Sequence, residues 1–182
     1  MRCDITLVIP AYNEEERLGS TLERAVDYLS RRGVAYEILV VDDGSRDRTV
    51  DVAERFSSRG VRVIRQDRNR GKGAAVRAGM LASLGSEVLL SDADASTPIE
   101  ELETLERRLP SAPVVLGSRA VEGADIRVHQ PFYRELMGKT FNAIIRLLGV
   151  RGLADTQCGF KLLAGDVARE LASRLTIDGF AY

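Results

Sequence analysis

The stretch "EVLLSDADASTP", residues 87–98, runs from three consecutive apolar residues into two aspartates and then into Thr97 and Pro98. A strand that is almost wholly apolar is usually buried on both faces, as the strands of a parallel sheet are. Threonine caps helices and proline fits their first position, so a helix is expected to follow directly. A buried strand followed by a helix is the repeating unit of α/β folds.

The same alternation extends along the chain in both directions. Further strands are expected at 5–9, 37–41, 61–65 and 113–117, where short β-branched runs occur. Helices are expected at 13–33 with acids in the first turn and Gly33 at the end, from Ser45 or Asp47 to Phe56, at 72–84, and from Thr97 to Leu109. The predicted inward positions are Leu22, Ala25, Val26 and Leu29 in the first helix, and Ile99, Leu102, Leu105 and Leu109 in the last. These elements predict an α/β fold with a mostly parallel central sheet flanked by helices.

Composition limits the class of protein. The chain has 182 residues, 45% of them apolar, and a net charge of −1, which predicts one soluble domain over 1–182 and gives no electrostatic footprint for nucleic acid. No apolar run is long enough for a membrane span, and the amino terminus does not resemble a secretory signal, so a cytoplasmic chain is expected. Cys3, Cys158 and the single His129 exclude a His/Cys zinc site and a Ser/His/Asp triad.

Unusual polar residues follow each predicted strand. The segments are "PAYNEEE" (10–16), "VDDGSRDRT" (41–49), "NRGKGAAVRAG" (69–79), "SDADAST" (91–97) and "GSRAVEG" (117–123). In open α/β sheets, ligands bind at the carboxyl ends of the strands, so these five segments are expected to converge on one crevice.

Each segment alone has an ordinary structural explanation. Acids after a strand commonly cap helices or form turns, and glycines can simply permit close helix packing. Together, however, three acidic loops and one Gly/Lys loop at one edge predict strong repulsion unless a cation and a phosphate ligand fill the space.

These motifs, in this order and spacing, resemble the family 2 glycosyltransferases, which have the GT-A nucleotide-sugar-binding fold with a Rossmann-like, mostly parallel central sheet. The later "DTQCGFKLL" (155–163) and "DGFAY" (178–182) are similar to the polyprenyl-phosphate branch of that family, which includes the dolichyl-phosphate glucose and mannose synthases. The spelling "DTQCGFK" favours the glucosyl type, with UDP-glucose preferred over GDP-mannose as the donor.

The resemblance implies a site for Mg²⁺ or Mn²⁺ at Asp92 and Asp94. One residue of spacing lets both acids turn toward the crevice beyond the strand, and a hard divalent ion there would stabilise the leaving diphosphate. Asp94 is the preferred direct ligand, and Asp92 is assigned to the sugar or to a metal-bound water. Some mannosyl relatives carry a glutamine two residues after the second acid, where this chain has Ser96.

The resemblance also implies a nucleotide site. Its residues are Pro10, Ala11, Tyr12, Glu14, Asp42 and Asp43 for the nucleoside, with Gly71 and Lys72 on the diphosphate side. Tyr12 could stack on a base and Asp43 could accept a hydrogen bond from a base N–H. A lysine beside glycine amides at a helix start suits an anion. Tyr12 could instead be a packing residue, and Lys72 a solvated charge.

For the acceptor, Arg119 and Arg134 match arginines that members of the family use to grip the lipid phosphate, and they are counted with Asp92 and Asp94 as catalytic residues. Arginine suits this role through its bidentate fork, although either residue could form a surface salt bridge instead. Gln157 and Lys161 are weaker candidates for binding the acceptor. Alternatively, they serve only to support the loop. A phosphate acceptor is already anionic, so the expected reaction is inverting transfer that depends mainly on positioning.

A polyprenyl-phosphate acceptor predicts peripheral contact with the cytoplasmic face of a membrane. The segment 134–153 could lie on that surface or pack as a core helix. Relatives carry a further carboxylate just after "GFAY", so a truncated catalytic domain is expected. Two alternatives stay open: an enzyme with a hydroxyl-bearing soluble or saccharide acceptor, and a non-catalytic nucleotide-sugar-binding module.

Overall fold

The computed structural model describes residues 3–117 and 158–179. The chain divides into two compact units, one formed by Met1–Val115 with Phe160–Tyr182 and the other by Leu116–Gly159. The fold and site described below belong to the first unit. The predicted helix at 134–153 and the candidate residues Arg119, Arg134 and Gln157 lie outside the described residues, and the single domain over 1–182 stays a prediction.

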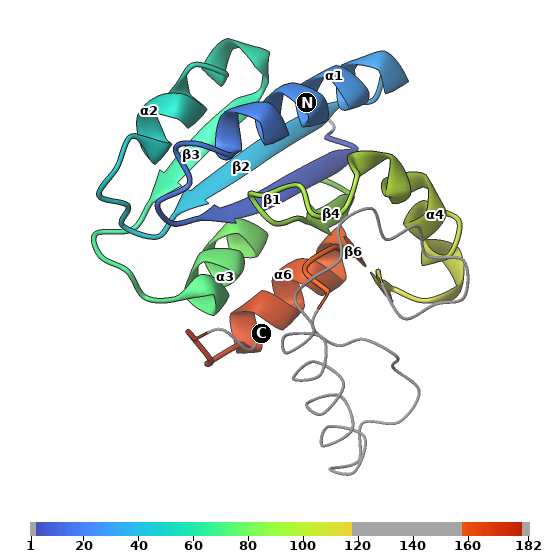
Figure 1. Cartoon of the computed structure of the whole chain (residues 1–182). Coiled ribbons are helices and arrows are strands. Elements are labelled where there is room, and N and C mark those ends of the chain that lie inside the picture. Colours follow the sequence, from blue (N-terminus) through green and yellow to red (C-terminus); the bar gives the residue numbers. More distant parts are fainter. Residues whose placement is uncertain (1–2, 118–157, 180–182) are drawn as a thin grey trace, which may run out of the picture. The chain divides into compact units, whose positions relative to one another are not determined.

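The sheet confirms the predicted α/β fold (Figure 1). Its strands in the described residues are β1 (Ile5–Ala11), β2 (Tyr36–Asp42), β3 (Val61–Arg65), β4 (Glu87–Leu90), β5 (Val114–Leu116) and β6 (Lys161–Ala164). They lie in the order β3-β2-β1-β4-β6-β5. Strands β1 to β4 are parallel, whereas β6 pairs antiparallel with β4, so that Leu90 faces Lys161. All five predicted strands are present, and β6 was not predicted.

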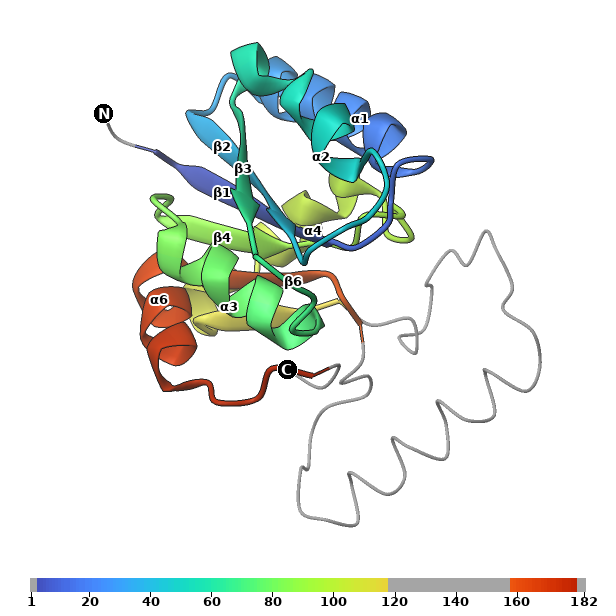
Figure 2. The same cartoon turned by 90° about the vertical axis from the view of Figure 1, so that its left-hand side faces the viewer.

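Helices cover both faces of this sheet (Figure 2). They are α1 (Leu18–Arg32), α2 (Thr49–Glu54), α3 (Lys72–Ala82), α4 (Leu102–Glu106) and α6 (Gly165–Arg174), with short 3₁₀ turns at Ser57–Arg59, Ile99–Glu101 and Leu109–Ser111. Helices α1 and α2 lie on one face, and α3 and α6 lie side by side on the other.

The structure corrects the predicted start of the first helix, which was expected at residue 13. Helix α1 begins at Leu18, so the acids at 14–16 precede it and none lies in its first turn. Those acids are held in a turn because the backbone N–H groups of Glu14 and Glu15 donate to side chains of the next loop. The left-handed Gly33 (φ 66°) ends α1 as predicted.

Two other helices are shorter than expected. Helix α2 ends at Glu54, and the Asp47 carboxylate accepts from the Thr49 N–H at 3.0 Å at its start, although neither Ser45 nor Asp47 is the residue that flanks the helix. The helix expected from Thr97 to Leu109 is broken into two 3₁₀ turns around α4. Ile99, Leu102 and Leu105 are buried as predicted.

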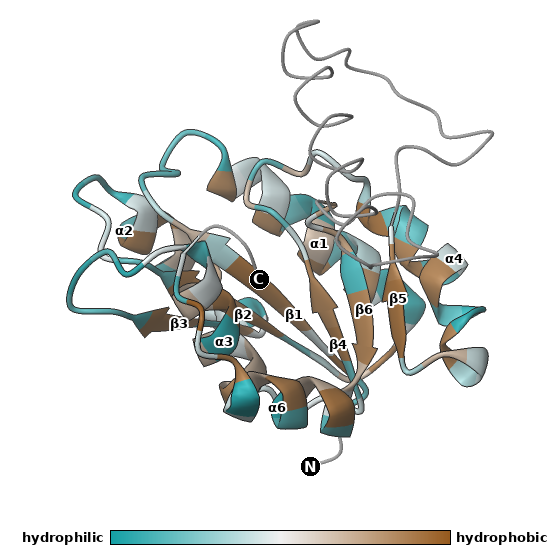
Figure 3. Cartoon of the chain, turned by 90° about the horizontal axis from the view of Figure 1, so that it is seen from below, coloured by the Kyte–Doolittle hydropathy of each residue, from teal (hydrophilic) through white to brown (hydrophobic). Residues whose placement is uncertain are grey.

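The core lies between the sheet and its helices, and the strands are its most hydrophobic part (Figure 3). On the α1 face, the four predicted inward residues of α1, Leu22, Ala25, Val26 and Leu29, are at most 3% exposed. On the other face, small residues let α3 and α6 approach closely. The buried apolar cluster on this face contains Val8, Leu39, Val41, Ala75, Val76, Met80, Val88, Leu90, Leu163, Ala168 and Ala172. This packing fixes the sheet edge that carries the polar loops.

Candidate functional site

The loops after β2, β1 and β4 lie next to one another because these three strands are neighbours in the sheet. Parallel strands end at the same edge, so the polar segments that follow them converge as the sequence predicted. The start of β6 reaches the same edge because that strand runs antiparallel to β4.

The loops after β1 and β2 are joined by hydrogen bonds from backbone to side chain. Asn13 N–H donates to Ser45 Oγ (3.0 Å), Glu14 N–H to Thr49 Oγ1 (2.7 Å) and Glu15 N–H to Asp47 Oδ2 (3.1 Å), while Asn13 Oδ1 accepts from Arg46 N–H (2.9 Å). Asn13 adopts a positive φ of 54°, which asparagine tolerates better than most residues. Residues 45–49 therefore provide hydrogen-bond partners for residues 13–15. We refer to these two joined loops as the loop platform.

Asp42 and Asp43 are buried, with exposures of 4% and 3%, and backbone groups satisfy them. The Asp42 carboxylate accepts from Ser45 N–H at 3.2 Å. The two oxygens of Asp43 accept from Arg70 N–H and Gly71 N–H, both at 2.8 Å. Asp43 thereby fixes the loop that leads into α3, and its contacts within the chain are those of a structural anchor.

Asp92 and Asp94 are in a different environment. The Asp92 carboxylate accepts from the Lys72 ammonium at 2.5 Å, and both side chains are partly exposed, at 30% and 26%. Asp94 is 40% exposed, accepts from Ser96 N–H at 3.0 Å and lies 4.0 Å from an Arg17 nitrogen. Within residues 3–117 and 158–179, the charged partners of these two acids are the cationic side chains of Lys72 and Arg17.

The expected repulsion among the acidic loops is therefore wrong. Protein groups balance much of the charge, because backbone N–H groups satisfy the acids of the loop at the end of β2 and cations pair with Glu14, Glu15, Asp92 and Asp94. Glu14 lies 2.7 Å from Arg17, and Glu15 lies 3.2 Å from Arg48. The acids alone therefore do not require a bound cation or phosphate.

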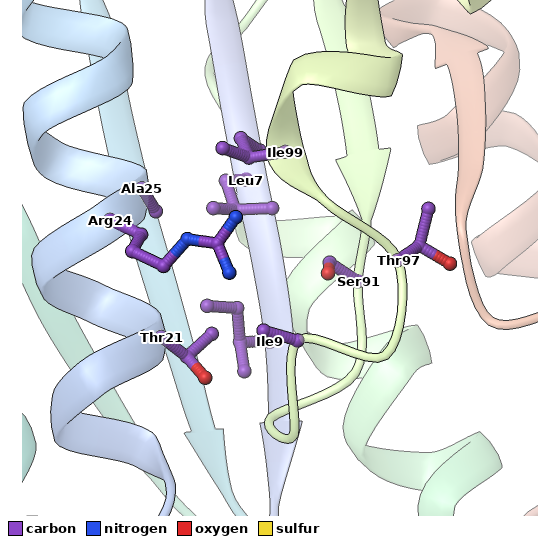
Figure 4. A pocket seen from close by; sticks show the side chains of 9 residues that line it. Leu7, Ile9, Thr21, Arg24, Ala25, Ser91, Thr97 and Ile99 are labelled. Carbon is purple, nitrogen blue, oxygen red and sulfur yellow. The ribbon is translucent and has the colours of Figure 1, made fainter. Parts of the chain in front are cut away.

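The loop that carries Asp92 and Asp94 is tied to α1 by Thr21. The buried Thr21 hydroxyl donates to Ala93 O at 2.7 Å. Beneath the loop is a cavity of about 20 Å³, with Thr21, Ser91 and Thr97 among its walls (Figure 4). Such a volume has room for about one water molecule. The sequence did not single out Thr21, whose only signal was a hydroxyl on the buried face of an amphipathic helix.

A second, open hollow of about 420 Å³ lies along Asn13–Arg17 and Asp47. Its volume falls within the range of small-molecule sites, roughly 300–1,000 Å³. Tyr12, immediately before it in the chain, is 40% exposed and thus presents its ring to solvent rather than to the core. The loop platform, the hollow along Asn13–Arg17 and the exposed ring of Tyr12 are compatible with a ligand that has a flat ring and polar groups.

The structure brings most of the predicted site residues to one edge. Those at the ends of strands or in the following loops are Pro10, Ala11, Tyr12, Glu14, Asp42, Asp43, Gly71, Lys72, Asp92 and Asp94, and Lys161 begins β6. Their predicted roles in binding stay predictions. The network of hydrogen bonds from backbone N–H groups to Asp42 and Asp43 could not be predicted from the sequence.

Within residues 3–117 and 158–179, no three His, Cys, Asp or Glu side chains gather as a complete metal site. Asp92 and Asp94 still fit a divalent ion of the Mg²⁺ type. Such ions commonly bind through one or two carboxylates and keep water and substrate phosphates as their other ligands. In the same described residues, no helix is long and apolar enough to cross a membrane.

The mostly parallel sheet and its loop-bearing edge have the GT-A nucleotide-sugar-binding fold, which solved structures share. Mannosyl-3-phosphoglycerate synthase from Rubrobacter xylanophilus superposes with a TM-score of 0.65 at 22% identity, covering 91% of this chain and 54% of that one. The mannosyltransferase PcManGT from Pyrobaculum calidifontis, solved in complex with GDP-Man and Mn²⁺, gives 0.62 at 21% identity, covering 97% and 47%. These likenesses show the fold.

The sequence model of glycosyl transferase family 2 matches residues 6–171, and the chain belongs to this family. A dolichyl-phosphate beta-glucosyltransferase of Trichomonas vaginalis is 42% identical, over 91% of this chain and 53% of its own length. The Homo sapiens protein of the same name is 36% identical, over 98% of this chain and 60% of its own length. The resemblance to the dolichyl-phosphate glucosyl branch is confirmed, and the chain spans between about half and three fifths of these relatives.

Proposed function

We propose that this chain is the donor-binding and catalytic part of an enzyme that transfers glucose from a nucleotide sugar to polyprenyl or dolichyl phosphate. The observation that carries the proposal is the pair Asp92 and Asp94 at the edge of the sheet, held by side-chain cations beside the loop platform. The similarity to proteins named dolichyl-phosphate beta-glucosyltransferase supports the choice of glucose and of a lipid phosphate.

For the donor, UDP-glucose is favoured over GDP-mannose. We assign the base to the exposed ring of Tyr12 and the hollow beside it, with Pro10, Ala11 and Glu14 as its surroundings. Asp42 and Asp43 contribute mainly by holding these loops, since backbone N–H groups already occupy their carboxylates. A base N–H could still bind a remaining lone pair of Asp43, because each carboxylate oxygen offers more than one acceptor direction.

Asp94, with Asp92, would hold Mg²⁺ or Mn²⁺. When bound, this ion supplies positive charge where the leaving diphosphate develops negative charge. Lys72 stands against Asp92 at the start of α3. Its ammonium is a compact charge on a flexible stem, so it can turn from Asp92 toward a donor phosphate.

For the acceptor, the proposed residues are Arg119, Arg134, Gln157 and Lys161, of which Lys161 lies at the described edge. A phosphate oxygen of the lipid attacks the anomeric carbon, the new C–O bond forms, and the bond to the nucleoside diphosphate breaks with inversion. Because the lipid phosphate is already anionic, no side chain has to remove a proton from it. Catalysis then depends on positioning and charge stabilisation.

A lipid acceptor requires contact with a membrane, and we propose a peripheral contact of the working enzyme at the cytoplasmic face. A second candidate is a donor-binding module that does not complete the reaction alone. It is favoured by one observation, which is that the chain spans only 53% and 60% of the two relatives described above.

The test is transfer of labelled sugar from UDP-glucose or GDP-mannose to polyprenyl phosphate, with Mg²⁺, Mn²⁺ or a chelator. We expect metal-dependent labelled lipid from UDP-glucose and loss of at least about 100-fold in Asp94→Asn, as for other removed charge-stabilising groups. Asp166→Asn is the matched control, because Asp166 is an exposed acid in the first turn of α6.

Three outcomes separate the alternatives. Product without metal, or full activity of Asp94→Asn, contradicts the metal assignment. Product only with hydroxyl acceptors contradicts the lipid-phosphate assignment. Metal-dependent nucleotide binding without any product identifies the donor-binding module.

A further inference from the structure

The segment that follows α6 returns to the start of α3, far away in sequence (Figure 2). Gly73 N–H donates to Gly179 O at 2.8 Å, and Ala74 N–H donates to Asp178 O at 3.1 Å. The first N–H groups of a helix have no partner inside the helix, so they need partners from elsewhere. Here two carbonyls of residues 178–179 provide them.

Side chains strengthen the same contact. The Asp178 carboxylate lies 2.9 Å from Arg70, which precedes α3, and 2.7 Å from Arg77, which lies within α3. Arg77 also donates to Leu175 O at 2.9 Å. The hydrogen bond from Arg70, together with the charge of Arg77, holds the pKa of Asp178 below its usual value, so the carboxylate is ionised near neutral pH.

The glycines of the "RGKG" stretch make room for this segment. Gly71 has a φ of 100°, and a side chain there would collide with Asp178 O. A Cβ on Gly73 would lie 2.8 Å from the carbonyl oxygens of both Ile177 and Gly179. Neither position can carry a side chain without moving the 177–179 backbone. Gly71, which the sequence predicts on the diphosphate side of the nucleotide site, is thus in contact with the chain's own backbone, and so is Gly73.

Four backbone N–H groups around this helix start have acceptors inside the chain. Those of Arg70 and Gly71 donate to Asp43, and those of Gly73 and Ala74 donate to residues 178–179. The group of α3 that reaches the polar edge is the Lys72 side chain, on Asp92. The position of Lys72 therefore depends on how firmly the helix start is held on both sides.

We infer that residues 175–179 form a clasp on the start of α3, and that Asp178 is a positioning residue that keeps Lys72 in reach of Asp92 and of the donor phosphates. Asp178 acts through Arg70, Arg77 and the helix start. Its effect on the donor rests on the proposed function, whereas the clasp itself does not.

The test compares the unaltered chain with Asp178→Asn, Asp178→Glu and a control, Glu170→Gln. Glu170 forms an exposed ion pair with Arg174 on α6, 2.6 Å long, which does not involve α3. The first readout is amide hydrogen exchange at Gly73 and Ala74, which reports local opening. The second is the dissociation constant of UDP-glucose with Mn²⁺, measured by calorimetry.

We expect Asp178→Asn to speed exchange at both amides by about tenfold and to weaken UDP-glucose binding by a similar factor, because one loosened contact controls both. Asp178→Glu should recover part of each effect, since it restores the charge. Glu170→Gln should change neither quantity.

Unchanged exchange in Asp178→Asn would overturn the clasp. Faster exchange with unchanged UDP-glucose binding would overturn the positioning role. If the unaltered chain binds neither UDP-glucose nor GDP-mannose, the proposed function fails and the positioning role with it, whereas the exchange rates still decide whether Asp178 holds the helix start.

Discussion

Two pairs of aspartates lie at the ends of strands β2 and β4 of the same sheet, and the environments of their carboxylates differ. Asp42 and Asp43 after β2 are buried and accept hydrogen bonds from backbone N–H groups. Asp92 and Asp94 after β4 are partly exposed, with cationic side chains as their charged partners. Backbone donors are fixed by the fold, whereas the ends of lysine and arginine side chains can move away at little cost.

This difference distinguishes carboxylates that anchor the loops from carboxylates that can bind a ligand. A carboxylate that holds backbone N–H groups cannot release them without disturbing the loops. A carboxylate paired with a partly exposed ammonium can exchange that partner, because exposed ion pairs contribute only about 0–1 kcal/mol. The pair after β4 is therefore the one that can accept a cation, and four measurements test this contrast.

The largest effect on stability is expected for Asp43→Ala. It removes the carboxylate that accepts from the N–H groups of Arg70 and Gly71, and a hydrogen bond to a charged group contributes about 1.5–3 kcal/mol. We expect the free energy of unfolding to fall by about 3 kcal/mol in urea denaturation. Asp166→Ala, at an exposed acid, should change it by less than about 0.5 kcal/mol. Equal effects of the two substitutions would show that Asp43 is no anchor.

A smaller effect is expected for Thr21→Val, which keeps the shape of the side chain and removes the bond to Ala93 O. The loss of one buried hydrogen bond should lower the free energy of unfolding by about 1 kcal/mol. Thr21→Ser retains the hydroxyl and should preserve Mn²⁺-stimulated nucleotide binding, which Thr21→Val should weaken. Both variants binding equally well would remove Thr21 from the support of the Asp92 loop.

Asp92→Asn and Asp94→Asn should change the free energy of unfolding by less than about 1 kcal/mol each, because their ion pairs are partly exposed. The same substitutions should abolish metal-stimulated nucleotide binding, which can be followed by titration with Mn²⁺. A loss of stability as large as that of Asp43→Ala would contradict the contrast between the two pairs.

The smallest effect concerns acid pH and Asp47. Burial alone would raise the pKa of Asp47, but hydrogen bonds from the Thr49 hydroxyl and from the N–H groups of Glu15 and Thr49 outweigh it and lower the pKa below 3.8. A lowered pKa in the folded state stabilises the fold above pH 3.8, and this contribution is lost as the pH falls below that value. The stability difference between the unaltered chain and Asp47→Asn should therefore shrink as the pH falls from 3.8 toward the lowered pKa of Asp47 in the folded state. A constant difference would contradict this role of Asp47.

The sequence predicted the sheet better than the loops, for a physical reason. Apolar β-branched runs have one stable location, which is the interior, so β1 to β5 could be predicted from pattern alone. The acids at 14–16 could not be placed, because their position outside α1 depends on donors and acceptors more than thirty residues away. Strand β6 could not be predicted from pattern alone, because the four residues "KLLA" are too short a run to distinguish a strand.

The same reason applies to the candidate site. The rule that ligands gather at strand ends identified the correct edge, and the order of strands then placed Asp43 and Asp92 there. The rule could not show which acids the backbone engages. Nor could it show that Gly71 and Gly73 contact residues 177–179, since that contact joins segments about a hundred residues apart.

The antiparallel direction of β6 has a consequence for how this family can diversify. Ala164 N–H donates to Pro113 O at 2.9 Å, so the end of β6 lies beside the start of β5 and the two strands run in opposite directions. The chain therefore leaves β5 and enters β6 at the same edge. An insertion between them adds length there without threading through the sheet, so this junction can change in size and sequence while the donor-side strands keep their register.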